Sequence, residues 1–549
     1  MKKHIVIALY ASLVYLDIWM YLAYPYRPFP SDDVWVYYPS LTMDTYDALS
    51  VMPYLIYPVL RYSLLGFKQI WTLLSSDALQ TLLFSAVISN SVTLFLSALI
   101  VFKITRSMTA MVIYMALYST SAWPANYYFF YTHAPWDAMI VMLIFFCIIG
   151  AYINPDKRNI LVSLSGVISG IMFWSAPQAA FIITLFIIAL ACLFRPLNAL
   201  YNRKVFATYA TSLWCGLTPL LFSSTPKMVR YLCYKGHWSH PLLAYKKFGF
   251  IPRLPLLGIF YLIKTYGTFL CAAFVAISIL FFAEMLIKYL TRRETIEYSV
   301  PERIITALLA FVWLYILSLT FWAFHKFGRL CFPVYPVILI SVICITHRFL
   351  KCHRMRYRCL VIVILVCAFA YVIATNVILC SQIMDVRKIA PAYLNNMNRH
   401  IQFYVLADDP HAEYIQEWLR SYNVQRIKIC ELDSPIFAGR RIGLIIGPHG
   451  TGSGTSILAH ACLDDFSLES LNKSKVIKRP HQRIILPYFA YFPTFLLEEE
   501  NCQALYLMGK TPDYKSDSKN LTLLLFDEQF SGHSHTHGRY SKGGNQFGL

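Results

Sequence analysis

Two adjacent carboxylates, Asp32 and Asp33, lie just beyond the first hydrophobic segment of the chain. Adjacent carboxylates repel each other and lose solvation near a membrane interface, so the pKa of one or both is raised. A carboxylate with a raised pKa can act as a general base, and a pair of carboxylates can also bind a cation. The pair therefore predicts acid–base chemistry or a divalent-cation site, with an ordinary acidic cap in a loop as the alternative.

A second group of chemically capable side chains lies in the aromatic stretch 127–137. This stretch contains His133 and ends at Asp137, where a membrane span is predicted to begin. We expect His133 and Asp137 to contact substrate at the mouth of that span. The alternatives are an aromatic belt at the membrane surface and, for Asp137, an N-terminal helix cap.

Cationic side chains are concentrated in a third stretch, where His325, Lys326 and Arg329 lie within five residues. Tyr335 follows in the run 332–336. Arginine offers a planar bidentate fork and lysine a point charge, and together they suit a phosphate group. We expect these residues to bind the phosphate of a substrate, and an ordinary interfacial anchor is the alternative.

A fourth stretch, between Phe222 and Leu256, contains six lysines and arginines and no acidic residue. Loops on the outer side of a membrane usually carry few basic residues. Either a span has been miscounted, or the positive charge serves to hold an anion. We expect the second, with Arg230 and Lys235 among the substrate-binding residues.

The composition of the chain is that of a membrane protein. Of its 549 residues, 57% are hydrophobic and 14% are charged, which excludes the ordinary soluble classes. The formal charge of +19 suggests nucleic-acid binding at first sight. Most of the excess lies in short loops between apolar segments, where it sets membrane orientation, so no nucleic-acid partner is predicted.

About eleven hydrophobic segments are near the length that crosses a bilayer as a helix. They fall near 5–23, 81–102, 107–123, 137–153, 160–175, 179–194, 205–222, 267–290, 304–323, 331–347 and 359–380. Lys2 and Lys3, with no cleavage site after the first segment, indicate a retained signal anchor. With this N-terminus in the cytoplasm, most basic loops also fall there, while the acidic pair and the stretches around His133 and His325 fall outside.

The remaining parts of the chain are a long outer loop and a C-terminal region. The loop, 24–80, is amphipathic and predicts one or two short interfacial helices, with a buried helix pair as the alternative. After about 385, alternating strand-like and helix-like runs predict a small α/β domain. The expected elements are strands at 403–407, 427–430 and 442–446, and a helix at 412–422.

We therefore predict three parts. They are a transmembrane domain over 1–380, an extracytoplasmic α/β domain over 381–530, and a disordered tail over 531–549. The fold class is a polytopic α-helical membrane protein with a small C-terminal α/β domain outside the membrane. A Gly-rich run at 447–456 is interpreted as a turn, because it lacks the lysine of nucleotide-binding loops.

This arrangement resembles the GT-C superfamily of polyprenyl-phosphate-sugar glycosyltransferases. Those proteins have an N-terminal span, an acidic motif near the start of a long first outer loop, and many further spans. Asp32 and Asp33 stand where that motif would be. The stretch 325–336 is similar to the His-Lys-Glu-x-Arg-Phe motif of dolichyl-phosphate-mannose-dependent mannosyltransferases, with Phe327 replacing the glutamate and Leu330 the phenylalanine.

The resemblance implies an enzyme that moves a hexose or pentose from a polyprenyl-phosphate carrier to an acceptor hydroxyl on the outer face, with inversion. Asp32 or Asp33 would take the proton of the hydroxyl, and Lys326 and Arg329 would balance the charge of the departing phosphate. The expected partners are the lipid-linked donor, a lipid, glycan or protein acceptor, and membrane lipids. No cofactor is required, although the acidic pair offers a site for a divalent metal.

The expected location is a bacterial inner membrane with the C-terminal domain in the periplasm, and the endoplasmic reticulum is the alternative. Two functions of other classes stay open. A transporter or flippase for an anionic lipid-linked saccharide would use the same basic groove without chemistry, although transporters more often carry ionisable groups in mid-span. A non-catalytic assembly protein of envelope-polysaccharide synthesis would use the outer domain for its interactions.

Overall fold

The computed structural model of the protein describes most helices, the strands and parts of the connections between them. The described residues are 3–24, 37, 41–51, 57–73, 78–121, 124, 133–175, 179–194, 199–235, 268–291, 299–322, 332–352, 358–359, 362–363, 365–374, 377, 395, 402–406, 412–421, 423–430, 442–446, 475–478, 495–497, 505–507 and 522–526. For some of these residues the description covers the backbone alone, among them 78–79, 179–181, 199–202, 222–235, 268–269, 288–289, 318–322, 403–406, 414–415 and the strands after 441.

The chain divides into two compact units. The first contains Met1–Arg387, Arg479–Phe492 and Thr511–Asp517. The second contains Lys388–Lys478, Pro493–Lys510 and Ser518–Leu549. The first unit holds the apolar helices, and the second holds a β-sheet with one described helix against it.

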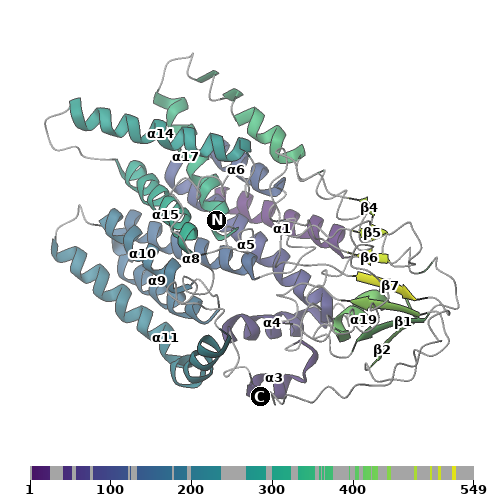
Figure 1. Cartoon of the computed structure of the whole chain (residues 1–549). Helices are drawn as coiled ribbons and strands as arrows, with labels where there is room; N and C mark the ends of the chain where they lie inside the picture. The colour runs from purple at the N-terminus through teal and green to yellow at the C-terminus, as the bar shows by residue number, and fades with distance from the viewer. Residues whose placement is uncertain are drawn as a thin grey trace. The chain divides into compact units, whose positions relative to one another are not determined.

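The apolar segments of the sequence form the long helices of the first unit (Figure 1). These helices are α1 (Lys3–Ala23), α5 (Ala78–Thr105), α6 (Met108–Ser119), α8 (Ala134–Ile153), α9 (Arg158–Phe173), α10 (Ala179–Phe194), α11 (Ala199–Lys235), α14 (Thr268–Thr291), α15 (Val300–Trp322) and α17 (Tyr335–Cys352). Each overlaps one predicted span, and 365–374 is a further apolar helical stretch within the last predicted span.

Five helical segments among the described residues are long and apolar enough to cross a membrane. They are Lys3–Leu22, Gln80–Thr105, Ala134–Ile153, Val300–Leu317 and Phe332–Lys351. Their length and composition make the chain an integral membrane protein. The number of about eleven spans stays a prediction, because several of the other apolar helices are shorter.

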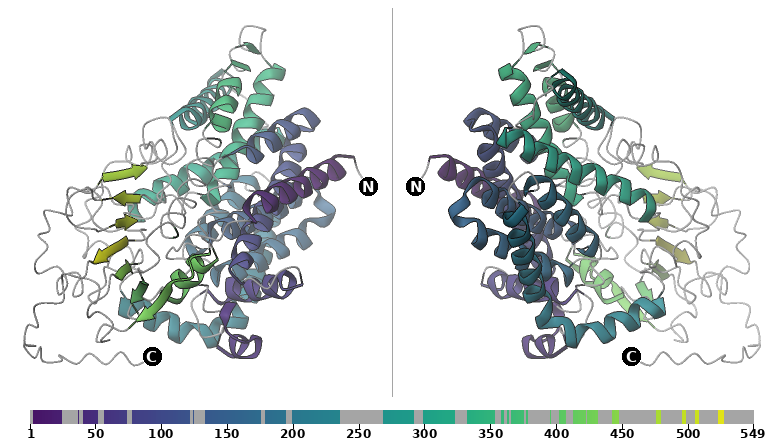
Figure 2. Two further views of the ribbon diagram at one scale, coloured as in Figure 1. Left: turned by 90° about the vertical axis from the view of Figure 1, so that its right-hand side faces the viewer. Right: turned by 90° about the vertical axis from the view of Figure 1, so that its left-hand side faces the viewer.

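Helices α5, α8 and α9 connect the rest of the bundle. α5 packs against α1, α8 and α17, α8 packs against α9, and α9 packs against α11. Figure 1 shows α9 and α11 side by side, and Figure 2 shows α1, in purple, at the edge of the bundle. A Cβ atom on Gly170 of α9 would lie 2.4 Å from the backbone oxygen of Leu213 in α11, so glycine is needed for this close approach.

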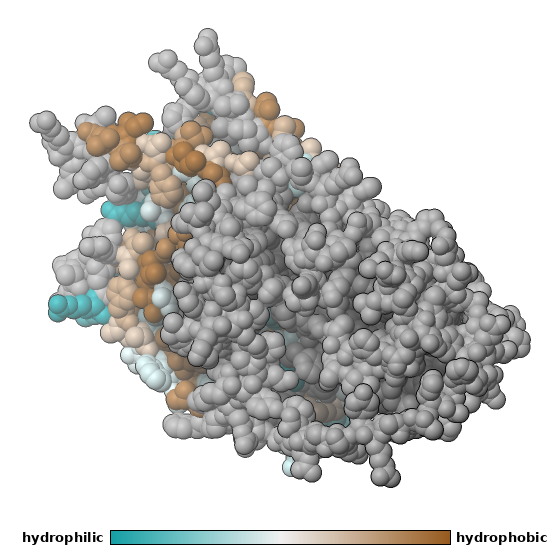
Figure 3. All heavy atoms as spheres, viewed as in Figure 1, coloured by the Kyte–Doolittle hydropathy of each residue, from teal (hydrophilic) through white to brown (hydrophobic). Residues whose placement is uncertain are grey.

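Apolar side chains are exposed on the outside of the bundle, as a membrane protein requires. On α14 they include Ile279, Leu286 and Leu290, which are exposed by 57% or more. Figure 3 shows hydrophobic residues gathered over this helix. Such a face is suited to contact acyl chains rather than water.

Two short helices lie in the first outer loop, in agreement with the sequence prediction. They are α3 (Thr45–Val51) and α4 (Pro58–Trp71). Gln69 Nε2 on α4 donates a hydrogen bond of 2.9 Å to Thr45 Oγ1 on α3. The Val59 amide donates to the carbonyl of Trp174, just after α9, at 3.3 Å. The first contact joins the two helices and the second fastens α4 to the bundle, and the depth of the loop in the membrane stays a prediction.

The bundle has two ends, which we name after the predicted orientation. At the outer end α1 finishes, and α5, α8 and the short 3-10 helix η3 (Phe332–Val334) with α17 begin. At the inner end α5, α8 and α17 finish and α15 begins. Basic side chains predicted to be cytoplasmic gather at the inner end, where Lys103 Nζ lies 3.7 Å from the ring centroid of Phe146 and Arg158 lies over Phe194.

Helix α11 corrects the predicted loop between Phe222 and Leu256. The predicted span ended at Phe222, whereas the helical backbone of α11 continues to Lys235 and includes Arg230. The prediction used apolarity, which marks where a helix leaves the membrane rather than where it ends. The residues from Lys227 to Lys235 combine three cationic with apolar and aromatic side chains and contain no glycine or proline, and Gly236 follows the last helical residue.

Within the described residues, the second unit contains a seven-stranded sheet in the order β2-β1-β3-β7-β6-β5-β4. Its strands are β1 (Gln402–Leu406), β2 (Ile427–Cys430), β3 (Ile442–Ile446), β4 (Lys475–Lys478), β5 (Phe495–Leu497), β6 (Leu505–Leu507) and β7 (Thr522–Phe526). β1 runs parallel to both β2 and β3, and β7 runs antiparallel to β3. Helix α19 (Ala412–Arg420) links β1 to β2 and packs on both.

The parallel half of this sheet lies where the sequence predicted strands. β4 to β7 were not predicted. β5 and β6 are runs of only three residues, too short to show a period-two pattern, whereas β7 is a five-residue run like β1 and β3 and was overlooked. Placement of this unit outside the cytoplasm stays a prediction.

Candidate functional site

The predicted site residues differ in how far the structure describes them. Asp32 and Asp33, like His325, Lys326 and Arg329, lie in connections outside the described residues. Arg230 and Lys235 are described in their backbone only. His133, Asp137 and Tyr335 are described in full and lie at the outer end of the bundle.

His133 and Asp137 form a buried pair at the start of α8. His133 is the residue before the first helical turn, and its carbonyl accepts the amide of Asp137 at 3.1 Å. Its Nε2 atom lies 3.6 Å from Oδ2 of Asp137, and the side chains are 4% and 0% exposed. Asp137 is therefore in the first turn rather than at the N-cap, contrary to the alternative considered from the sequence. An imidazole beside a carboxylate is suited to proton exchange with a polar substrate group.

Tyr335 is the first residue of α17 and joins that helix to the end of α6. Its phenol oxygen and the hydroxyl of Ser121 form a short hydrogen bond. The ring is 1% exposed and lies near the rings of Phe332 and Tyr118, with centroids 6.2 and 6.4 Å away. Because η3 packs on α8, the structure brings Tyr335 to the same end as His133 and Asp137.

Both segments that carry the predicted motifs connect to this outer end. The segment 25–36, with the acidic pair, lies between Tyr24 and Tyr37, and Gln80 Nε2 at the start of α5 donates to the Tyr24 carbonyl at 3.0 Å. The segment 323–331, with the cationic motif, joins the end of α15 to η3. The antiparallel pair α15 and α17 thus returns the chain to the outer end between Trp322 and Phe332.

A buried arginine at the same end was missed by the sequence reasoning. Arg61 lies on α4, is 8% exposed, and has its guanidinium carbon 5.8 Å from the ring centroid of Tyr37. Burial lowers the pKa of the Arg61 guanidinium from its ordinary value. The position of Arg61 in the sequence could have indicated its burial. It lies one residue after Leu60 and three before Leu64, on the apolar face of an amphipathic helix.

A line of buried polar side chains on α5 was also missed. Ser89, Thr93 and Ser97 each donate to the carbonyl four residues earlier. Beside them Asn90 accepts from the Tyr118 hydroxyl at 3.2 Å. An asparagine inside an otherwise apolar span was the signal, because intramembrane polar groups need partners.

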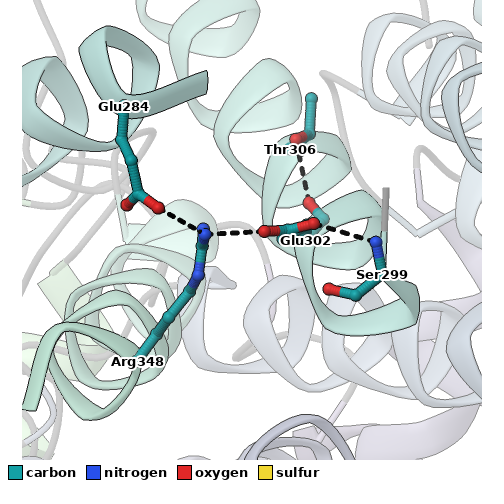
Figure 4. Close-up of polar contacts among 5 residues, drawn as sticks. All are labelled: Glu284, Ser299, Glu302, Thr306 and Arg348. Carbon is teal, nitrogen blue, oxygen red and sulfur yellow. Dashed lines mark hydrogen bonds and ion pairs between the residues drawn. The ribbon is translucent and has the colours of Figure 1, made fainter. Parts of the chain in front are cut away.

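The inner end contains a charged cluster that joins three helices (Figure 4). Arg348 Nη2 on α17 lies 2.7 Å from Oε1 of Glu284 on α14 and 2.6 Å from Oε1 of Glu302 on α15. Glu302 also accepts the Ser299 amide at 2.8 Å, which closes the first turn of α15. This cluster lies at the opposite end from the candidate site, so we assign it a structural role.

The described residues contain no group of three or more His, Cys, Asp or Glu side chains that is suited to hold a metal ion. The divalent-metal site expected from the sequence would use Asp32 and Asp33. These two residues lie outside the described residues, so that site stays a prediction.

No protein-family model matches the chain, and no curated protein matches it. Solved structures do match. ArnT from Cupriavidus metallidurans in the apo state is 10% identical, with a TM-score of 0.48 over 96% of this chain and 98% of that one. The same protein bound to undecaprenyl phosphate is 10% identical, with a TM-score of 0.46 over 95% and 97%.

The oligosaccharyltransferase of Archaeoglobus fulgidus, tethered with an acceptor peptide, is 15% identical, with a TM-score of 0.43 over 78% of this chain and 64% of that one. All three TM-scores are below 0.5, so these likenesses carry no argument about this chain. At such identities and TM-scores they assign neither a substrate nor a site residue to this chain. The particular resemblance to mannosyltransferases stays a prediction.

Proposed function

We propose that the protein is a membrane glycosyltransferase that moves a sugar from a polyprenyl-phosphate carrier to an acceptor hydroxyl at the outer end of the bundle. The main support is that the acidic segment 25–36 and the cationic segment 323–331 both connect to that end. A base and a phosphate-binding group are the two requirements of this reaction, and the sequence supplies one in each segment.

In the proposed reaction Asp32 accepts the proton of the acceptor hydroxyl. The hydroxyl oxygen attacks the anomeric carbon of the donor, and the bond from that carbon to the phosphate oxygen breaks. The polyprenyl phosphate leaves with the bonding electrons, and the configuration at the anomeric carbon inverts. Asp33 holds Asp32 in position or serves as the base in its place, and a positioned base typically contributes about 10²–10⁴-fold in rate.

The departing phosphate carries negative charge that a cationic site stabilises. We assign this role to Lys326 and Arg329, with His325 beside them and Arg230 and Lys235 contributing from α11. A guanidinium or ammonium group lowers the barrier when it binds the phosphate more strongly in the transition state, as its charge develops, than in the ground state. The isoprenoid tail then lies along the apolar helices.

His133, Asp137 and Tyr335 are proposed to contact the polar part of the donor or acceptor. The described part of the outer end supports this, because the three side chains come from the starts of α8 and α17, next to η3. Transfer assays with different labelled sugars and acceptors will identify whether the transferred group is a hexose or a pentose, and what the acceptor is.

The test is transfer of label from lipid-phosphate sugars by the purified protein in nanodiscs. Undecaprenyl phosphate, the lipid in one of the structures reported above, is the first carrier to try. We expect labelled sugar in a product that no longer contains the lipid phosphate. Addition of a chelator tests the metal option, since a metal-dependent reaction would stop and a reaction that uses Asp32 as base alone would continue.

Transport of an anionic lipid-linked saccharide is the second candidate function, favoured by the buried Ser89, Asn90 and Thr93 within α5. Polar side chains inside a span mark the path of a polar headgroup in some transporters. In proteoliposomes a transporter moves labelled saccharide across the bilayer with its phosphate bond intact, whereas the proposed enzyme breaks that bond. A non-catalytic assembly protein does neither.

We place the C-terminal unit outside the cytoplasm, in the periplasm of a bacterium, with the endoplasmic reticulum lumen as the eukaryotic equivalent. The support is the gathering of basic side chains at the inner end of the bundle. A reporter that is active only in the cytoplasm, fused after Cys380, is expected to be inactive. An active fusion would reverse the orientation and remove the proposed site from the outer face.

A further inference from the structure

We propose that Arg61 and Tyr37 form a positioning contact that fixes the downstream end of the segment carrying Asp32 and Asp33. The inference rests on the function proposed above and deepens it, because it names residues that set the place of the base. Neither residue is assigned a contact with substrate.

The contact joins two buried side chains from different parts of the first outer loop. The Arg61 guanidinium carbon lies 5.8 Å from the ring centroid of Tyr37, and the two residues are 8% and 1% exposed. A guanidinium over an aromatic face is attracted by the ring quadrupole, and the attraction grows when water is excluded. Arginine stays charged even when burial lowers its pKa, because its ordinary value is so high.

The helix that carries Arg61 is itself firmly held. On α4, the Phe67 ring packs edge-on against Phe84 of α5 and Trp136 of α8, with centroids 6.1 and 6.5 Å away. The start of α4 is held by the hydrogen bond from Val59 to Trp174. Arg61 therefore offers Tyr37 a fixed point, on a loop helix that packs against the bundle.

The upstream end of the acidic segment is held to the same elements. Gln80 Nε2 of α5 donates to the Tyr24 carbonyl at 3.0 Å, and the Tyr24 ring lies 6.4 Å from the ring of Trp71, the last residue of α4. Of the two residues that flank the segment 25–36, Tyr24 is thus attached to α4 and to the start of α5, and Tyr37 is attached to α4. This two-ended attachment is what we infer to position the acidic pair.

The attachment is close enough along the chain to affect the base. Asp33 is four residues from Tyr37, so their Cα atoms are at most about 14 Å apart. A misplacement of about 1 Å at a reacting group can lower the rate roughly 10²-fold. Loss of the attachment is therefore expected to lower kcat, while the donor site, formed by other segments, keeps its affinity.

The kinetic test uses variants that remove or keep the contact. Arg61→Gln and Tyr37→Leu remove it, and we expect kcat to fall about 10–100-fold with the KM for donor changed less than about twofold. Tyr37→Phe keeps the ring and Arg61→Lys keeps the cation, so both are expected to retain most of the activity. Arg158→Gln is the matched control, because Arg158 lies 5.8 Å from the Phe194 ring at the inner end.

A second measurement does not depend on activity. Hydrogen–deuterium exchange in peptides covering 25–36 is expected to be faster in Arg61→Gln and Tyr37→Leu than in the wild type and in Arg158→Gln. Unchanged exchange overturns the positioning role, whatever kcat does, and so does an equal fall of kcat in Arg158→Gln. Faster exchange in a protein whose wild type transfers no sugar would establish the contact and overturn the proposed function instead.

Discussion

The two ends of the helix bundle use charged side chains in different ways. At the inner end, Arg348 Nη2 lies within 2.7 Å of carboxylates from two other helices, so one positive charge is shared between two negative ones. At the outer end, Arg61 lies over an aromatic ring, and His133 faces Asp137 across 3.6 Å, which is longer than a good hydrogen bond.

This difference separates stability from function. The inner cluster joins α14, α15 and α17 through ion pairs and has no predicted motif beside it. The outer charges lie on α4 and at the start of α8, at the end of the bundle to which the acidic and cationic segments connect. We therefore expect substitutions at the outer end to change transfer more than stability, and substitutions at the inner end to do the reverse.

The largest effect that this comparison predicts is at the base. Asp32→Asn is expected to lower sugar transfer by about 10²–10⁴-fold with donor binding retained, since asparagine keeps the size of the side chain but accepts no proton at neutral pH. Asp33→Asn is expected to have a smaller or equal effect. Transfer of labelled sugar and donor binding are measured on the same purified proteins.

Asp47→Asn is the matched control, because Asp47 is an exposed carboxylate on α3 in the same outer loop. It is expected to leave transfer unchanged. If Asp33→Asn alone were inactive, the two carboxylates would exchange roles. If both variants transferred sugar at the normal rate, neither carboxylate would be the base, and the base would have to be sought elsewhere.

The elements on which this comparison depends were predictable to different degrees. Long apolar runs located the helices, because a bilayer crossing needs about 20 apolar residues whatever the neighbours are. The stretch between Tyr54 and Trp71 is rich in tyrosine and leucine and has few charged residues, and this composition likewise predicted the position of α4 in the outer loop. These are local properties of the chain, so one sequence is enough to find them.

Contacts between distant residues were not predictable in this way. The pairing of Arg348 with Glu284 spans 64 residues, and that of Tyr335 with Ser121 spans 214. Both depend on which helices lie side by side, which a hydrophobic pattern does not specify. Arg348 lies in one of the basic stretches that the sequence analysis attributed to orientation alone, and the carboxylates that contact it were overlooked.

The second prediction tests the inner end. Arg348→Met is expected to lower the free energy of unfolding by about 2–4 kcal/mol, because it leaves two partly buried carboxylates facing each other without the cation. The transfer rate per folded molecule is expected to stay near that of the wild type. Thermal unfolding in detergent and the transfer assay measure the two quantities.

Arg203→Met controls for loss of a basic side chain, since Arg203 is exposed on α11 at the same end. It is expected to change stability little. An Arg348→Met protein with wild-type stability and a slow reaction would contradict the assignment of the inner end to stability.

The third prediction concerns the cationic segment of the outer end. Lys326→Ala and Arg329→Ala are each expected to weaken donor binding by about 1.5–3 kcal/mol, the usual contribution of a charge-assisted hydrogen bond to phosphate. Donor affinity is measured by titration with the lipid phosphate. Lys204→Ala, an exposed lysine on α11 at the inner end, is the control. Unchanged affinity in both variants would identify the segment as an interfacial anchor.

The smallest predicted effect concerns the hydrogen bond between Tyr335 and Ser121, and it is tested by removing each hydroxyl in turn. Tyr335→Phe and Ser121→Ala each remove one hydroxyl of the buried pair and leave the other without that partner. Each is expected to lower the free energy of unfolding by about 0.5–1.5 kcal/mol. If Tyr335 also contacts the donor, as proposed, only Tyr335→Phe will weaken donor binding, by roughly 2–10-fold for one neutral hydrogen bond. Equal stability losses with normal donor affinity in both would make the pair a helix-to-helix contact, and the outer end would then resemble the inner end at this position.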